Sequence, residues 1–514
     1  MKPTNNLKTI MVQGTASHVG KSLLTAALCR IMKKRGLAVA PFKAQNMALN
    51  SFVTMDGAEI GRAQALQAEA AGLEPSLDMN PILLKPTGDA VSQVIIHGKV
   101  FASMSATEYH SFKSEAFAFV LESIERLSED YEVLVIEGAG SPAEINLREN
   151  DIVNMGLAER IDAPVILVGD IDRGGVFAAI VGTLELLTDD ERARVKGIII
   201  NKFRGDKSLL DGGLKFLEAR LGIPVLGVVP HMETSGLPDE DGVSLDRVFS
   251  DTLLREKLKT TSRLNIAVMR LPRISNFTDF DPLKEEDDVV VRYIHGPDDL
   301  NAMMEADLVI LPGTKNIISD LAWLREIGFP DSLATYLAGG GRLFGICGGF
   351  QMLGRTIGDP DAVEGDIENA EGFSLLDMET VLKKKKDTFR VAATLMDSEK
   401  TAIEGYEIHM GETVSRENPF ALITRRNNSK VALDIADGAV STDKKVSGTY
   451  IHGIFDNDIW RTGFLNSLRE VRGLAVKGTG ELSFKSSREA AIEALAKTVE
   501  DNVDMDALFK IVGL

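Results

Sequence analysis

The chain of 514 residues is too long for one hydrophobic core, and its 44% apolar and 26% charged residues are typical of globular proteins, so we expect two or three domains. A formal net charge of −19 argues against nucleic acid as a partner, because phosphate backbones need a basic face. The two cysteines exclude a disulfide framework, no apolar run could span a membrane, and the first residues show no signal-peptide pattern, which together favour a cytoplasmic protein.

The first expected elements are a buried strand over residues 9–12, a glycine-bounded loop, and a helix. The loop has the sequence GTASHVGKS over residues 14–22, one residue longer than the standard P-loop. In a P-loop, backbone N–H groups bind phosphate oxygens of a nucleotide such as ATP, the lysine reaches the terminal phosphates, and the following hydroxyl is a ligand for Mg²⁺. The nucleotide-binding residues predicted here are Gly14, Thr15, Gly20, Lys21 and Ser22.

Short apolar strands then alternate with helical stretches, which predicts an α/β fold with a mostly parallel sheet covered on both faces. Ligands bind at the carboxyl ends of the strands in such sheets. Polar residues recur at those ends, and four of them follow successive strands: Lys43, Glu137, Asp170 and Asn201.

Several of these residues have a candidate role and a plain structural alternative. Lys43 is a candidate for neutralising charge on a transferring phosphoryl group, or a surface lysine. Ser22, Glu137 and Asp56 offer the oxygen ligands that Mg²⁺ prefers, although Asp56 also suits a simple Asp-Gly turn. Asn201 is a candidate for contacting the nucleotide base, or a strand cap.

Longer blocks of this half resemble known families. The loop resembles the P-loop of the dethiobiotin synthetase superfamily, whose members use ATP to convert a carboxylate into an acyl phosphate. Residues 41–47 (PFKAQNM), 56–64 (DGAEIGRAQ) and 79–86 (MNPILLKP) resemble the cobyric acid synthase family, the glutamine-dependent amidases of cobalamin biosynthesis. The resemblance extends through the second half and is weakest at the C-terminal end.

The pattern loosens after the last strand of the first series, and a second series of buried strands begins at residue 265. We therefore expect a P-loop synthetase domain over residues 1–231, a linker over 232–262, and a second domain over 263–514 that ends in packed helices. The lysine run at residues 383–386 is expected to be a solvated hairpin tip.

The second half contains the sequence GICGG at residues 345–349, between an expected strand and an expected helix. Small residues around a nucleophile at such a turn are typical of a nucleophile elbow, where the helix N-terminus favours the thiolate of Cys347. The N–H of Gly348 is a candidate oxyanion-hole donor, and the turn at Gly313 is a second one.

A cysteine nucleophile needs a base, and two histidines, His409 and His452, lie in strand-like runs. The elbow resembles that of class I glutamine amidotransferases, which implies an α/β domain of that class with His452 as the base. That class usually has Glu two residues after the histidine, where this chain has Ile454, a departure that the cobyric acid synthase branch shares. Two alternatives stay open for the imidazole: either Glu407 orients it, or the site is a Cys–His dyad with no third residue.

The resemblance implies an amidoligase that uses ATP, Mg²⁺ and L-glutamine to amidate the b, d, e and g side-chain carboxylates of adenosylcobyrinic acid a,c-diamide, a small-molecule corrinoid. Asp170 and Asp172 are candidates for the substrate site or for a helix cap. The alternatives are cobyrinic acid a,c-diamide synthase, with the same two halves, and a P-loop switch ATPase joined to a non-catalytic glutaminase-like domain. The route of ammonia and the oligomeric state, a homo-oligomer included, stay open.

Overall fold

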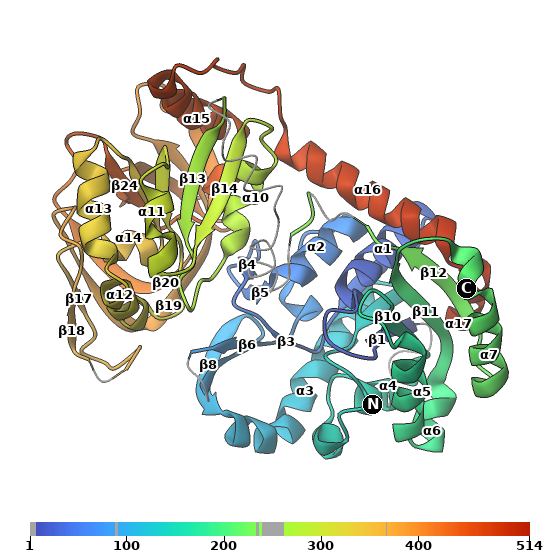
Figure 1. The fold of residues 1–514 in the computed structure, drawn as a ribbon. Coiled ribbons are helices and arrows are strands. Elements are labelled where there is room, and N and C mark those ends of the chain that lie inside the picture. The colour runs from blue at the N-terminus through green and yellow to red at the C-terminus, as the bar shows by residue number, and fades with distance from the viewer. Residues whose placement is uncertain (1–6, 88–90, 233–235, 239–261, 366) are drawn as a thin grey trace.

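The computed structural model describes residues 7–87, 91–232, 236–238, 262–365 and 367–514, which form two α/β halves (Figure 1). The expected linker over residues 232–262 lies almost entirely outside these ranges. None of the helices within them is both long enough and apolar enough to cross a membrane.

The N-terminal half is built on a six-stranded parallel sheet in the order β12-β11-β10-β1-β9-β2, which confirms the expected fold class. The strands are β1 (Lys8–Gly14), β2 (Val39–Phe42), β9 (Val133–Glu137), β10 (Val165–Asp170), β11 (Val195–Phe203) and β12 (Val225–Pro230). The helices are α1 (Lys21–Lys34), α2 (Arg62–Ala71), α3 (Ala106–Asp130), α4 (Met155–Arg160), α5 (Val176–Leu186), α6 (Asp189–Arg194) and α7 (Asp211–Leu221), with short turns η1 (Leu77–Met79), η2 (Ile145–Asn150) and η3 (Lys207–Leu210). The strands are continuous apolar runs because helices bury both faces of the sheet.

Two smaller strand groups extend this half towards the second half. A four-stranded sheet contains β3 (Gln45–Met47), β6 (Ile82–Pro86), β7 (Val91–Ile96) and β8 (Lys99–Ser105), and a hairpin contains β4 (Ser51–Val53) and β5 (Glu59–Gly61). The hairpin packs on the second half, because Phe52 and Ile60 share one buried apolar cluster with Tyr406 and Ile408. The two halves therefore meet through a packed interface.

The C-terminal half has a parallel sheet in the order β14-β13-β15-β16-β24-β23, with only β23 antiparallel among its described strands. Its strands are β13 (Leu264–Met269), β14 (Val289–Ile294), β15 (Leu308–Leu311), β16 (Leu343–Ile346), β23 (Ala439–Val440) and β24 (Val446–Thr449). A second sheet contains β17 (Thr356–Gly358), β18 (Asn369–Glu371), β19 (Met378–Leu395), β20 (Ala402–Ser415), β21 (Ala421–Arg426) and β22 (Ile435–Asp437). The helices are α10 (Asp281–Lys284), α11 (Leu300–Met303), α12 (Ile317–Glu326), α13 (Phe329–Ala338), α14 (Gly348–Met352) and α15 (Asp458–Arg472), with η5 (Phe277–Phe280), η6 (Pro297–Asp299) and η7 (Ile454–Asp456).

The last two helices, α16 (Phe484–Asn502) and α17 (Met505–Val512), belong to the N-terminal half, so the expected domain over residues 263–514 extends too far. Figure 1 shows α16 leaving the C-terminal half and lying along α1. Its apolar face, which includes Leu495 and Val499, joins the core around β1 and α1. At its edge, Arg30 forms an ion pair with Glu489 at 2.6 Å. The burial of this face decides the position of the helix.

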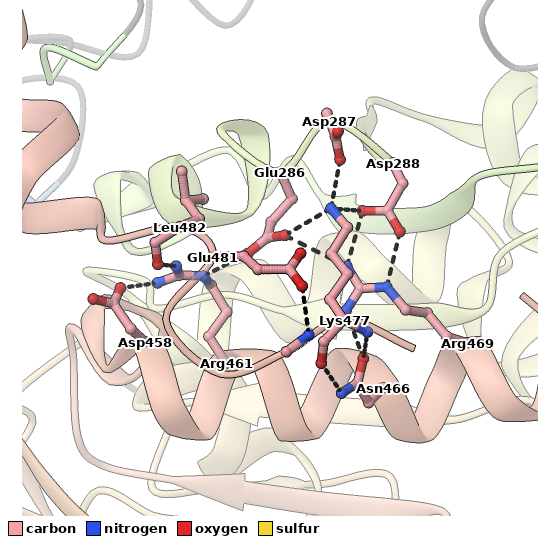
Figure 2. A network of polar contacts seen from close by, with 11 residues as sticks. Glu286, Asp287, Asp288, Asp458, Arg461, Asn466, Arg469, Lys477, Glu481 and Leu482 are labelled. Atoms are coloured by element: carbon pink, nitrogen blue, oxygen red, sulfur yellow. Dashed lines mark hydrogen bonds and ion pairs between the residues drawn. The ribbon is translucent and has the colours of Figure 1, made fainter. Parts of the chain in front are cut away.

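A buried ionic network anchors the segment that leads to α16 (Figure 2). Arg461 and Arg469 of α15 have no exposed surface; Arg461 Nε donates to Glu286 Oε1 at 3.0 Å, and Arg469 Nε donates to Asp288 Oδ2 at 2.8 Å. Lys477 joins the same acidic group, with its Nζ 2.8 Å from Asp288 Oδ1. The chain after α15 is thus fixed to the C-terminal half before it crosses to the other half.

The lysine run at residues 383–386 is not a hairpin tip but lies within the long strand β19. The β19–β20 register shifts between Leu382 and Asp387. The side chains of Lys384 and Lys385 are exposed, whereas that of Lys386 is only 8% exposed and contacts Glu59 of the other half. The run therefore divides into exposed lysines and one that is buried at the interface.

Candidate active sites

The predicted P-loop lies between β1 and α1, at the carboxyl edge of the sheet. Lys21 Nζ donates to the carbonyl oxygens of Ala16 at 3.0 Å and Gly140 at 2.9 Å, so it lies across the loop. Gly20 has φ +99°, and a Cβ there would come within 2.2 Å of Asn201 Nδ2. Only glycine suits that position. At the start of the loop, a Cβ on Gly14 would come within 2.6 Å of the Val19 side chain.

The carboxylate of Glu137, at the end of β9, is the centre of the polar group beside this loop. Ser22 Oγ and Lys43 Nζ donate to its Oε1 at 2.7 and 2.8 Å. Gln67 and Gln64 of α2 donate to its Oε2 at 2.6 and 3.5 Å. The structure thus brings three of the predicted residues together and adds two glutamines. The sequence signal for them was weak: polar residues three apart on an alanine-rich helix.

The side chains at this point fit a hard cation such as Mg²⁺. Ser22 and Glu137 present oxygen atoms close together, and Mg²⁺ is typically held by one or two such protein ligands together with substrate phosphates. Within the described part of the chain no group of three or more His, Cys, Asp and Glu side chains could hold a metal by itself. Nucleotide phosphates would complete the coordination.

Asp56, the third predicted Mg²⁺ ligand, lies in the exposed turn between β4 and β5. Its carboxylate accepts a hydrogen bond from Thr54, and Gly57 next to it has φ +84°. The carbonyl of Gly57 accepts from Thr388 Oγ1 of the other half at 2.7 Å. These contacts are those of an Asp-Gly turn that directs the hairpin towards the C-terminal half, and the role of Asp56 as a Mg²⁺ ligand stays a prediction.

The remaining predicted residues of this half lie at the ends of β10 and β11. Asn201 Nδ2 donates to Val19 O at 2.8 Å and so braces the P-loop. Asp170 pairs with Lys202 at 2.9 Å and accepts the backbone N–H of Asp172 at 2.9 Å. Asp172 pairs with Arg204 at 3.0 Å. All of these contacts are to neighbouring protein groups. A contact of Asn201 with the nucleotide base, or of Asp170 and Asp172 with substrate, stays a prediction. The Thr15 N–H likewise donates to a protein group, the Val168 carbonyl of β10, at 2.9 Å.

In the C-terminal half, Cys347 lies on a strained turn between β16 and α14. Its φ and ψ are 51° and −110°, which are unusual for a residue with a side chain. A Cβ on Gly349 would come within 2.0 Å of Leu311 O, so the turn needs glycine to pack against β15. This geometry is that of a nucleophile elbow. The other thiol, Cys29, is buried in the core and burial raises its pKa.

A histidine–aspartate pair lies beside the thiol. His452 Nδ1 is 2.6 Å from Asp279 Oδ2, and the other carboxylate oxygen accepts the N–H of Gly453 at 2.9 Å. Both side chains are buried, with Asp279 supplied by η5. The sequence did not indicate Asp279, because it lies far from His452 along the chain, in a stretch without a motif.

Glu407, which was expected to orient the imidazole, has other partners. Arg426 donates to both of its oxygens, at 2.9 and 3.0 Å, and His409 Nε2 lies 3.5 Å away. The expectation is therefore corrected. Tyr406, the residue before Glu407, forms the backbone bridge to His452. Because successive side chains of a strand point to opposite faces, that of Glu407 points away from His452. Asp279 takes the place beside His452 Nδ1.

The charges of this group favour a thiolate–imidazolium pair. Burial raises the pKa of Cys347, but the charge of His452, hydrogen bonds from His452 and Gly348 N–H, and the charge of His409 outweigh burial, so that the pKa falls. Burial lowers the pKa of His452, but Asp279 and Cys347 raise it to about 10. A thiolate is the form of cysteine that can act as a nucleophile.

The two predicted oxyanion-hole glycines flank this group. The Gly348 N–H lies next to the Cys347 sulfur and helps to lower the pKa of the thiol. A Cβ on Gly313 would lie 3.0 Å from His452 Cε1, a tight contact, so a side chain there would press on the imidazole ring. Both glycines are thus next to the reacting groups, and their roles as donors stay predictions.

The fold and these two sites define the class of protein, a nucleotide-binding half joined to a glutamine amidotransferase half. Comparisons with known proteins agree. Residues 10–243 match the CobQ/CobB/MinD/ParA nucleotide binding domain, and residues 265–460 match the CobB/CobQ-like glutamine amidotransferase domain.

Curated relatives match almost the whole chain. It is 49% identical over 508 residues to a cobyric acid synthase of Clostridium botulinum (strain 657 / Type Ba4), covering 98% of this chain and 99% of that protein. It is 51% identical over 527 residues to a cobyric acid synthase of Sorangium cellulosum (strain So ce56), with the same coverage. The chain belongs to the cobyric acid synthase family, and it is a glutamine-hydrolysing, ATP-dependent amidoligase.

Proposed function

We propose that this enzyme amidates the b, d, e and g side-chain carboxylates of adenosylcobyrinic acid a,c-diamide to give adenosylcobyric acid. The relatives that match over 98% of the chain support this substrate. The observation that carries the mechanism is the presence of two complete polar groups on one chain, one around Glu137 and one around Cys347. The first suits carboxylate activation, and the second suits release of nitrogen from glutamine.

In the C-terminal half, the Cys347 thiolate attacks the side-chain amide carbon of glutamine. The N–H groups of Gly348 and Gly313 stabilise the oxyanion of the tetrahedral intermediate. His452, oriented by Asp279, donates a proton to the leaving ammonia, and then takes a proton from the water that hydrolyses the glutamyl thioester to glutamate. The buried His452–Asp279 pair supports this role because it fixes the tautomer of the ring.

In the N-terminal half, a substrate carboxylate oxygen attacks the γ-phosphorus of ATP, and ADP leaves. Ammonia then attacks the acyl carbon and phosphate leaves, which gives a carboxamide. Lys21 and Lys43 neutralise negative charge on the transferring phosphoryl group. Ser22 and Glu137 would hold Mg²⁺, which when bound neutralises charge on the nucleotide phosphates. Phosphorylation of the carboxylate is needed because an unactivated carboxylate does not react with ammonia at neutral pH.

The proposal is tested by mass spectrometry of the corrinoid after incubation with ATP, Mg²⁺ and glutamine. Adenosylcobyrinic acid a,c-diamide is expected to gain four amides, each by exchange of a hydroxyl for an amino group. Cobyrinic acid is the comparison substrate. Conversion of cobyrinic acid to its a,c-diamide, with no reaction of the diamide, would show the alternative diamide synthase activity instead.

A further inference from the structure

Cys347 opens into a cavity of about 490 Å³, its open mouth included, whose wall comes from both halves. Three lysines line it: Lys85 from β6 of the N-terminal half, and Lys315 and Lys386 from the C-terminal half. The mechanism above uses none of them. A glutamine bound with its side-chain amide at Cys347 must place its α-carboxylate elsewhere in this cavity.

Two of the lysines share one carboxylate. Lys85 Nζ donates to Glu59 Oε1 at 2.8 Å and to Ser51 Oγ at 3.0 Å. Lys386 Nζ contacts the other oxygen of Glu59 and lies 3.4 Å from Gln93 Oε1. The side chains of Glu59, Lys85 and Lys386 are 1%, 4% and 8% exposed. Two buried ammonium groups against one carboxylate leave an excess positive charge at the interface.

The third lysine adds to this excess. Among the described residues, no side chain or carbonyl accepts a hydrogen bond from Lys315 Nζ. Burial and the charge of Lys85 lower the pKa of Lys315, and burial with the charges of Lys85 and Lys315 lowers that of Lys386 to about 7 despite Glu59. The ammonium groups repel one another, and an anion among them would relieve that repulsion.

The opposite wall does not supply this anion. Glu364 lines the same cavity, but its Oε2 accepts the N–H groups of Ile317 and Ile318 at 2.7 and 3.1 Å. Burial raises the pKa of Glu364 to about 7. The charge of Glu364 acts on the N-terminus of α12 and also raises the pKa of Lys315, but burial and Lys85 outweigh it there. The three lysines thus face only two carboxylates, Glu59 and Glu364.

We propose that Lys85, Lys315 and Lys386 form the subsite for the α-carboxylate of glutamine, and that the N-terminal half completes this subsite with Lys85. The inference rests on the proposed function, in which Cys347 hydrolyses glutamine. The subsite adds a determinant of specificity for glutamine, and this determinant depends on the packing of the two halves against each other. A substrate with the same side-chain amide but no α-carboxylate lacks the anion that this subsite binds.

The test compares hydrolysis of L-glutamine with that of L-glutamine α-amide, whose α-carboxylate is replaced by a neutral carboxamide. The enzyme should prefer glutamine, and Lys315→Met and Lys386→Met should each lower the ratio of kcat/KM values for the two substrates by at least about tenfold, mainly through KM for glutamine. Lys315→Arg should restore most of the ratio. Lys384→Met, which removes an exposed lysine of the same run, is the matched control and should leave the ratio unchanged.

Complete alkylation of Cys347 by neutral iodoacetamide shows that the thiol stays accessible and the elbow intact in each variant. Lys315→Met is the decisive variant, because its ammonium group holds no bond that folding needs. Lys85→Met then tests the contribution of the other half. An unchanged substrate ratio in Lys315→Met and Lys386→Met would overturn the subsite while leaving the proposed function intact. Absence of glutamine hydrolysis in the unaltered enzyme would instead overturn the proposed function.

Discussion

Replacing Asp279 by asparagine removes one charge from the group around Cys347 and changes almost no volume. The contact is a 2.6 Å hydrogen bond between two buried side chains, and Asp279 is the first of the groups that raise the pKa of His452 to about 10. A neutral amide would no longer stabilise the imidazolium or fix the tautomer. By analogy with the same change in other histidine–aspartate pairs, kcat/KM for glutamine should fall about 10³–10⁴-fold, or about 4–5.5 kcal/mol of transition-state stabilisation.

The assay measures glutamate release and, separately, amidation with free ammonia, which should stay near the unaltered rate because it bypasses Cys347. Glu407→Gln is the matched control, since it also neutralises a buried carboxylate close to a histidine. We expect it to lower glutaminase activity by less than about tenfold, because the His452 pair stays intact. Full glutaminase activity in Asp279→Asn, or an equal loss in Glu407→Gln, would refute the assignment.

Three further predictions follow from the geometry. In His452→Ala the Cys347 thiol loses the charge and the hydrogen bond that most lower its pKa. The pKa should therefore rise, and iodoacetamide alkylation at pH 7 should slow by at least about tenfold; an unchanged pH profile would contradict this. Lys21→Ala should stop amidation with glutamine and with ammonia alike, and activity with ammonia would argue against the P-loop assignment. Leu495→Ala should lower the free energy of unfolding by about 2–5 kcal/mol in denaturant titrations, whereas a helix outside the core would show little change.

Features contained in one continuous stretch could be predicted from the sequence. The P-loop and the elbow each consist of a strand, a turn with glycines and a helix, and the glycines are needed where a Cβ would collide with neighbours. The alternation of strands and helices likewise predicted both α/β halves, which the structure and the family matches confirm.

Features that depend on distant segments could not be predicted. Asp279 meets His452 only because η5 packs against η7, the turn that follows His452, and a lone aspartate in a loop has no pattern of its own. Lys386 looked like its exposed neighbours, since a register shift, not composition, directs it inward. The helical periodicity of α16 predicted an apolar face but not which half would bury it.

The most direct measurement follows nitrogen from glutamine labelled with ¹⁵N in its side-chain amide into the corrinoid product of the unaltered enzyme and of Cys347→Ala. We expect label in the new amides of the unaltered enzyme, no amidation by Cys347→Ala with glutamine, and full amidation by Cys347→Ala with ammonia. Labelled product from Cys347→Ala and glutamine, or equal loss with both nitrogen donors, would contradict the assignment of nitrogen release and carboxylate activation to separate halves.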